Sequence, residues 1–217
     1  MGLMPLTIVD DFYDNPEEVR EFALSLDYSD GPGNFPGYRS PLISTVDVDF
    51  YIKFVNKIVG MFWNTHKETL DCQVETYFQY IPGWFGSSGW AHTDRKTSFA
   101  GVVYLTPDIP QHLGTAICKQ KFNNTTLDFS IRDDFYAGKP VNKKEYVDAR
   151  NNHNFNFETV LNVDNIYNRM LMYDGQAPHK ENGFHGTTLE DSRLTQVFFA
   201  KVELGENTDY PLQRGNT

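Results

Sequence analysis

The segment Trp90-Ala91-His92-Thr93-Asp94 contains the residues of this sequence that are best suited to bind a metal ion. In an extended chain, side chains two positions apart point to the same side. His92 and Asp94 can therefore reach one ion together while Thr93 faces away. An imidazole and a carboxylate are two of the three ligands in the facial triad that binds non-haem Fe(II) and leaves coordination positions open. Such a pair also occurs in ordinary turns, so its interpretation depends on the rest of the chain.

A second polar group stands at the start of the last apolar segment, where Arg193 opens the run Leu194-Thr195-Gln196-Val197-Phe198-Phe199. An arginine in such a strand is costly to bury unless it pairs with an anion, and its planar guanidinium suits a carboxylate. Thr195 faces the same side of the strand and can donate its hydroxyl to the same group. We interpret the two residues as a candidate carboxylate-binding site.

The pattern of the chain changes from helices to short strands. A strand is expected at 6–9 and amphipathic helices at 16–26 and 47–66, with a loop rich in Gly and Pro at 28–44. The later β-rich segments are 74–80, 98–105, 114–119, 155–163, 169–173 and 193–202. Helices followed by many short strands favour an α+β chain built on a sandwich or jelly-roll, which can enclose an internal site.

We predict a single domain over residues 1–217, because no repeat, low-complexity run or change of composition marks a boundary. The expected parts are a helical N-terminal support at 1–70, a jelly-roll core at 71–204 with an insertion at about 121–155, and a tail at 205–217. The insertion is mostly polar, with one helix expected near 143–150, and His153 is expected to be solvated.

Hydrophobic residues make up 40% of the chain and charged residues 22%, which is an ordinary globular composition. The formal net charge of −10 and the isoelectric point of about 5.0 disfavour binding to nucleic-acid backbones. The two cysteines form no CxxC motif, so neither a disulfide framework nor a zinc ribbon is indicated. Without a signal-peptide pattern or an apolar run of membrane-spanning length, we expect a cytoplasmic protein that does not bind membranes.

Five short motifs occur along the chain in a characteristic order. They are Tyr80-x-Pro82-Gly83, His92-x-Asp94, Val103-Tyr104-Leu105, Tyr173 followed six residues later by His179, and Arg193-x-Thr195. In this order they resemble the 2-oxoglutarate/Fe(II)-dependent dioxygenase superfamily, in particular its prolyl-hydroxylase-like branch. The resemblance implies a double-stranded β-helix core (jelly-roll, cupin-like) with helices packed on the outer face of the major sheet.

The resemblance also implies a set of metal ligands, in which His92, Asp94 and His179 would bind Fe(II). The distance along the chain from His179 to Arg193 is longer than the tight hairpin typical of the branch, and His185 is a rival third ligand. We favour His179, because its offset from the strand that ends near residue 173 fits the branch better. The extra residues would then form a loop near the site, in which His185 is a candidate substrate contact.

For the co-substrates, the resemblance implies 2-oxoglutarate and O2. Arg193 would pair with the distal carboxylate of 2-oxoglutarate, assisted by Thr195 and Tyr104. Tyr80 stands where the family often has a tyrosine near the co-substrate. Both tyrosines also have an ordinary interpretation as half-buried strand residues. The implied reaction converts 2-oxoglutarate to succinate and CO2 and usually hydroxylates a C–H bond.

The sequence leaves the substrate open to an amino acid, a peptidyl side chain or a small metabolite, and it carries no signal of oligomeric state. Trp84 and Trp90 are candidate substrate contacts, although aromatic residues in a Gly/Ser loop also serve to pack the loop against the core. Two alternatives stay open. One is a cupin-like metalloenzyme that does not use 2-oxoglutarate, and the other is a non-catalytic jelly-roll binding module.

Overall fold

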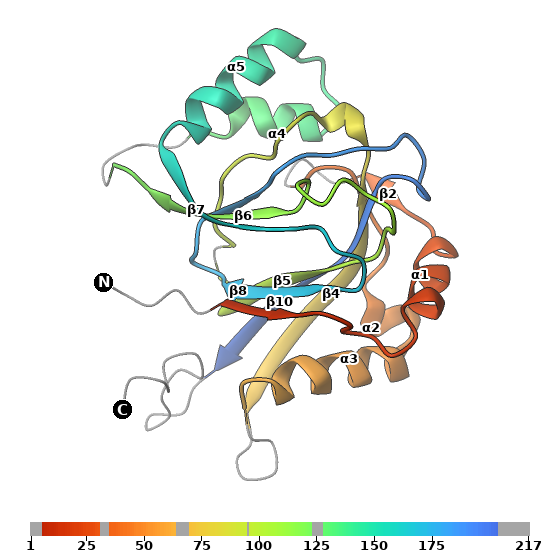
Figure 1. Cartoon of the computed structure of the whole chain (residues 1–217). Coiled ribbons are helices and arrows are strands. Elements are labelled where there is room, and N and C mark those ends of the chain that lie inside the picture. Colours follow the sequence, from red (N-terminus) through yellow and green to blue (C-terminus); the bar gives the residue numbers. More distant parts are fainter. Residues whose placement is uncertain (1–5, 31–34, 64–69, 95, 123–127, 204–217) are drawn as a thin grey trace.

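The computed structural model describes residues 6–30, 35–63, 70–94, 96–122 and 128–203, so the tail expected at 205–217 lies outside it. Within these residues, two antiparallel sheets face each other (Figure 1). The major sheet has the order β1-β8-β5-β10-β4-β3-β2, and the minor sheet has the order β7-β6-β9. The major-sheet strands are β1 (Leu6–Val9), β2 (Ser29–Asp30), β3 (Tyr38–Arg39), β4 (Asp71–Ile81), β5 (Phe99–Tyr104), β8 (Met170–Asp174) and β10 (Arg193–Glu203). The minor-sheet strands are β6 (Thr115–Gln120), β7 (Phe157–Val163) and β9 (His179–Glu181).

The helices of the first part of the chain lie against the major sheet (Figure 1). Their bounds are α1 (Pro16–Leu24), α2 (Ile43–Val46) and α3 (Val48–Gly60). Proline is tolerated in the first turn of α1, because a backbone N–H at that position would have no partner within the helix. The Asp47 carboxylate caps α3 by accepting a hydrogen bond from the Phe50 backbone N–H at 2.9 Å. None of the described helices combines the length and the apolar character needed to cross a bilayer.

Strand alternation divides the core into an outer and an inner half. On β10, Leu194, Phe198 and Ala200 belong to the cluster that packs against the helices, where Phe54 of α3 meets Phe198 at 5.4 Å between ring centroids. Val197, on the other side of the strand, faces the inner cluster between the two sheets. This arrangement confirms the predicted jelly-roll core with helices on the outer face of the major sheet.

The insertion differs from its prediction, since its described part forms two helices, α4 (Ser130–Tyr136) and α5 (Lys143–Asn154), on the side of the minor sheet (Figure 1). Tyr146, Arg150 and His153 form the buried side of α5 at helical spacing. Two of these three are polar, so no apolar stripe marks the helix in the sequence. The prediction that His153 is solvated is wrong, because it is 6% exposed and its Nε2 lies 2.6 Å from the Ala91 carbonyl oxygen.

Candidate metal centre

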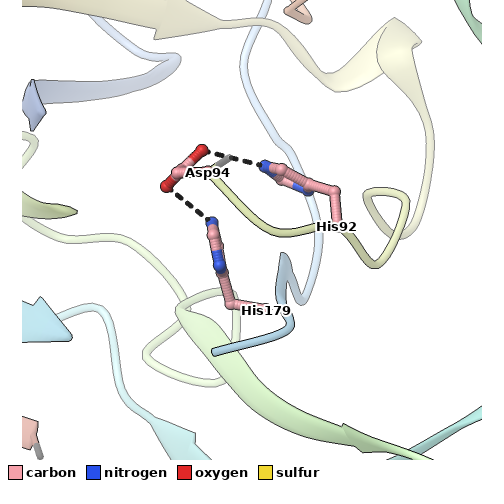
Figure 2. Close-up of side chains that lie close together, drawn as sticks. All are labelled: His92, Asp94 and His179. Atoms are coloured by element: carbon pink, nitrogen blue, oxygen red, sulfur yellow. Dashed lines mark ion pairs between the residues drawn. The ribbon is translucent and has the colours of Figure 1, made fainter. Parts of the chain in front are cut away.

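His92, Asp94 and His179 come together in the interior, and their ligand atoms all lie within 4.8 Å of one another. The two imidazoles approach the carboxylate from separate segments (Figure 2). Asp94 Oδ1 is 3.8 Å from His92 Nε2, and Asp94 Oδ2 is 3.4 Å from His179 Nε2. Neighbouring octahedral ligands at about 2.1 Å from an ion lie about 3 Å apart, so small shifts would close this set around one ion.

The backbone fixes the position of both histidines. His92 and His179 form an isolated antiparallel bridge, in which each N–H donates to the other's carbonyl oxygen at 2.9 Å. Residues opposite each other in such a bridge project their side chains to the same face, and the two ring centroids are 4.4 Å apart. The Asp94 N–H donates to the Gly175 carbonyl at 2.8 Å. The segment that carries His92 therefore extends the minor sheet beside β9.

The hydrogen bonds of the two imidazoles determine which nitrogen faces the shared point. His92 Nδ1 is 2.8 Å from the Trp90 carbonyl oxygen, and His179 Nδ1 is 3.0 Å from the Ala177 carbonyl oxygen. A carbonyl oxygen only accepts, so each Nδ1 carries the proton and each Nε2 presents a lone pair. In this tautomer both Nε2 atoms are free to coordinate a metal ion.

The electrostatics of the cluster favour a cation. Burial lowers the pKa of His179, which keeps its ring neutral at pH 7, and the nearby Asp94 carboxylate only partly opposes this effect. Asp94 Oδ2 is buried and has no hydrogen-bond partner among the described residues. Two lone pairs and a carboxylate directed at one point repel each other unless a positive ion lies between them. The donor set therefore fits a divalent transition metal.

His185, the rival third ligand, lies apart from this cluster. It belongs to the loop between β9 and β10, which packs on the turn after β4 through a bond of 2.9 Å from the Gly83 N–H to the Gly186 carbonyl. Its Nε2 is buried without a hydrogen-bond partner among the described residues. Of these two histidines, His179 is the one that lies with His92 and Asp94.

The candidate carboxylate site is built around Arg193, which is 2% exposed. Its Nη2 donates to Thr115 Oγ1 at 3.3 Å, and the Thr115 hydroxyl is 2.7 Å from the Tyr104 hydroxyl. Arg193 Nε is buried without a partner, and no carboxylate of the described residues forms an ion pair with this guanidinium. Thr195 lies opposite Tyr104 in the β10–β5 register, on the same face as Arg193. Sequence reasoning missed Thr115, because nothing local indicates that β6 crosses the site.

Tyr80 was expected near the co-substrate, and the structure corrects this expectation. Side chains alternate along β4, so Gln79 and Ile81 line the inner cavity while Tyr80 points the other way. Tyr80 lies opposite Leu194 in the β10–β4 register and stacks on Tyr38 with 4.8 Å between ring centroids. Gln79 is therefore the polar β4 side chain that lines the cavity, beside Ile81.

A cavity of about 570 Å³ contains both the metal cluster and the exposed part of Arg193. Tyr173 also lines it, with its ring centroid 4.3 Å from that of His179. In the sequence only its spacing from His179 distinguished this tyrosine. Trp90 reaches the wall but is 2% exposed and packs on Tyr146 at 5.8 Å, so its main contacts are with the insertion. Trp84 is 51% exposed and is not among the lining residues, which removes the support for a substrate contact.

No family model and no curated protein sequence matches this chain. Its fold is similar to solved structures of several oxygenases. A prolyl-4-hydroxylase from Pseudomonas putida matches with a TM-score of 0.53 at 13% identity, over 93% of this chain and 94% of that chain. A second match is a prolyl hydroxylase from Trichoplax adhaerens, which was solved with a peptide fragment of the hypoxia inducible factor oxygen degradation domain. Its TM-score is 0.53 at 11% identity, over 98% of this chain and 87% of that chain.

HygX from Streptomyces hygroscopicus, solved with nickel and 2-oxoglutarate bound, matches with a TM-score of 0.55 at 14% identity, over 91% of this chain and 83% of that chain. The likeness is one of fold, and it extends over nearly the whole chain. This chain therefore has the double-stranded β-helix fold of the 2-oxoglutarate/Fe(II) oxygenases.

Proposed function

We propose that the protein is an Fe(II)- and 2-oxoglutarate-dependent dioxygenase that oxidises a C–H bond of an amino-acid, peptidyl or small-metabolite substrate. One observation carries the proposal. A cluster of two imidazoles and one carboxylate shares a cavity with a buried arginine that forms no ion pair among the described residues. The first feature suits a divalent metal and the second suits a carboxylate, and 2-oxoglutarate bound to iron connects the two.

The proposed roles follow from the geometry. His92, Asp94 and His179 would hold Fe(II), and three protein ligands leave positions for the co-substrates. Arg193 would bind the distal carboxylate of 2-oxoglutarate, with its orientation fixed by the hydroxyl chain from Thr115 to Tyr104. The bound iron and 2-oxoglutarate, with O2, would supply the oxidation of the C–H bond, while 2-oxoglutarate becomes succinate and CO2.

The chain's own contribution is to enclose and orient the reactants. The inner cluster around Val102, Leu171 and Val197 forms an apolar floor between the sheets, which excludes water from the carboxylate site. The neutral Nε2 atoms of both histidines are preorganised by their Nδ1 bonds to backbone carbonyls. Neighbours of this fold support the range of substrates, since the Trichoplax enzyme was solved with a peptide and HygX also with hygromycin B.

The test is succinate formation from 2-oxoglutarate, measured with Fe(II) and O2 against amino acids, peptides and a host lysate. We expect the activity to need both Fe(II) and O2 and to be lost in His179→Ala, with His185→Ala as the matched histidine control. Arg193→Met should bind metal but release no succinate. Succinate formation equal to wild type in Arg193→Met would overturn the role of Arg193 in binding 2-oxoglutarate. Wild type that binds metal but forms no succinate would overturn the proposal and favour a cupin-like enzyme that does not use 2-oxoglutarate.

A further inference from the structure

A second arginine, Arg39 of β3, lines the cavity of the metal centre. It lies opposite Gln79 of β4, which in turn lies opposite Thr195 of β10. Residues that are paired in this way share one face of the sheet, so Arg39 projects into the interior beside the carboxylate site. Two strand spacings separate Arg39 from Thr195, which is about 10 Å between backbones. Arg39 and Arg193 therefore mark two separate parts of one cavity.

The side chain of Arg39 is held firmly in place. Its Nε donates to Gln79 Oε1 at 2.9 Å, and Gln79 Nε2 donates to the Pro36 carbonyl at 2.7 Å. The guanidinium carbon lies 3.8 Å from the centroid of the Phe35 ring and 5.3 Å from that of Phe199. These contacts fix the plane of the guanidinium and leave its terminal N–H groups without a hydrogen-bond partner among the described residues.

The charge of Arg39 is only partly balanced by the protein, because the carboxylates of Asp94, Glu181 and Glu75 act on it without forming an ion pair. No ion pair joins it to a carboxylate in the described part of the chain. Burial lowers its pKa to about 10, so the group still carries its charge at neutral pH. A partly desolvated guanidinium without an anion is costly, and the surrounding rings only offset part of that cost. The arrangement fits a group that completes its interactions when an anion binds.

The other charged side chains on the cavity wall already have partners or other roles. Arg132 forms an ion pair with Asp133 at 2.7 Å, and Lys180 Nζ donates to Ser88 Oγ at 3.3 Å. Glu181 also lines the wall, but its negative charge would repel a substrate carboxylate. With Arg193 assigned to the co-substrate, Arg39 is the remaining guanidinium on the described wall that forms no ion pair.

We infer that Arg39 is a substrate-binding residue and that the substrate carries a carboxylate, which pairs with the guanidinium while the adjoining carbon chain reaches the metal. The inference rests on the proposed function and deepens it, because it names a chemical class of substrate for the same cavity. A planar carboxylate matches the fork of N–H donors that Arg39 presents. Two sources offer this group: a free amino or organic acid, and the acidic side chain of a peptide.

The experiment uses the full chain loaded with Mn(II) and N-oxalylglycine, an unreactive analogue of 2-oxoglutarate that fills the metal and Arg193 sites. The probes are free amino acids with their carboxamides, and blocked tripeptides containing Asp or Glu with their Asn or Gln counterparts. Binding is followed by ligand-observed NMR. We expect carboxylate probes to bind at least about ten times more tightly than their amides, which corresponds to one lost charge-assisted contact. The series that shows the preference identifies the source.

Variants locate the preference on Arg39. Arg39→Gln should bind both members of each pair equally, Arg39→Lys should retain part of the preference, and Arg132→Gln should retain all of it. The inference is overturned if no carboxylate probe binds the loaded wild type, if amides bind equally well, or if Arg39→Gln keeps the preference. If Arg39→Gln does not fold, the inference is tested by comparing carboxylate and amide probes in wild type and in Arg39→Lys. A wild type that does not take up Mn(II) and N-oxalylglycine would instead reject the proposed function.

Discussion

Asn154 of α5 is hydrogen-bonded to the backbone of Ala91, the residue that precedes the metal ligand His92. Its Oδ1 accepts from the Ala91 N–H at 2.9 Å, and its Nδ2 donates to the Gly89 carbonyl at 2.9 Å. The helical insertion therefore holds the segment that carries His92, although it contributes no ligand of its own. We expect Asn154→Ala to weaken Mn(II) binding about tenfold, because partners that orient ligands typically contribute this much.

An electron paramagnetic resonance titration of free Mn(II) measures this affinity directly. Asn152→Ala is the matched control, because Asn152 lies on the same helix and is exposed. Equal Mn(II) affinity in Asn154→Ala and wild type would show that the β-bridge between His92 and His179 positions the ligand without help from α5.

We expect Arg193 to lower the free energy of unfolding of the metal-free protein and to contribute to the binding of 2-oxoglutarate. Its buried guanidinium has no anionic partner among the described residues, so replacing it with an apolar side chain of similar length removes a desolvation cost. Arg193→Met should raise the free energy of unfolding of the metal-free protein by about 1–3 kcal/mol. The same variant should lose the thermal stabilisation that 2-oxoglutarate gives to the Mn(II)-loaded wild type.

Urea denaturation measures the first effect and a melting curve measures the second. Arg169→Met is the contrasting variant, because Arg169 pairs with Asp10 through two N–H donors at 2.5 and 2.9 Å. A loss of more than about 2 kcal/mol in Arg193→Met would mean that the protein itself satisfies this arginine.

His153 should make the metal-free protein less stable in acid. Burial lowers its pKa below the ordinary value of 6.5, and the bond to the Ala91 carbonyl only partly opposes this. Because the unfolded chain binds the proton more readily, the contribution of His153 to stability is complete above pH 6.5 and is lost as the pH falls through the lowered pKa. The free energy of unfolding should therefore decrease between pH 7.5 and pH 5.

His153→Gln retains an N–H donor for Ala91 and removes the titrating ring, so the decrease should become smaller. Part of it will remain, because burial also lowers the pKa values of His179 and His185. Urea titrations in the presence of EDTA at several pH values measure the difference. The same pH dependence in wild type and His153→Gln would contradict this assignment.

The local part of the site could be predicted from the sequence. His92 and Asp94 share one side of an extended segment, and this alternation needs no knowledge of the fold. The position of His179 depends on a bridge between distant segments, so only the resemblance to a known family could propose it. The helices on the outer face could also be predicted from a local pattern, because residues such as Phe54 and Ile58 form an apolar stripe along α3 at helical spacing.

Other features depend on choices that the sequence pattern does not determine. Both faces of β4 carry apolar and polar residues, so the pattern does not show whether Gln79 or Tyr80 faces inward. The buried side of α5 contains Arg150 and His153, which hydrogen-bond to the carbonyl oxygens of Ser88 and Ala91 in the segment that carries His92. Such a helix has a polar composition and a buried face, and only tertiary contacts distinguish it from a surface helix.

The most direct test of the central claim is the anaerobic addition of Fe(II) and 2-oxoglutarate to the metal-free protein, followed by visible absorption spectroscopy. Coordination of 2-oxoglutarate to a ferrous ion held by His92, Asp94 and His179 should produce a weak metal-to-ligand charge-transfer band. We predict the band in wild type and in His185→Ala and its loss in His179→Ala. A wild type without the band, or a band that survives in His179→Ala and disappears in His185→Ala, would contradict the assigned metal centre.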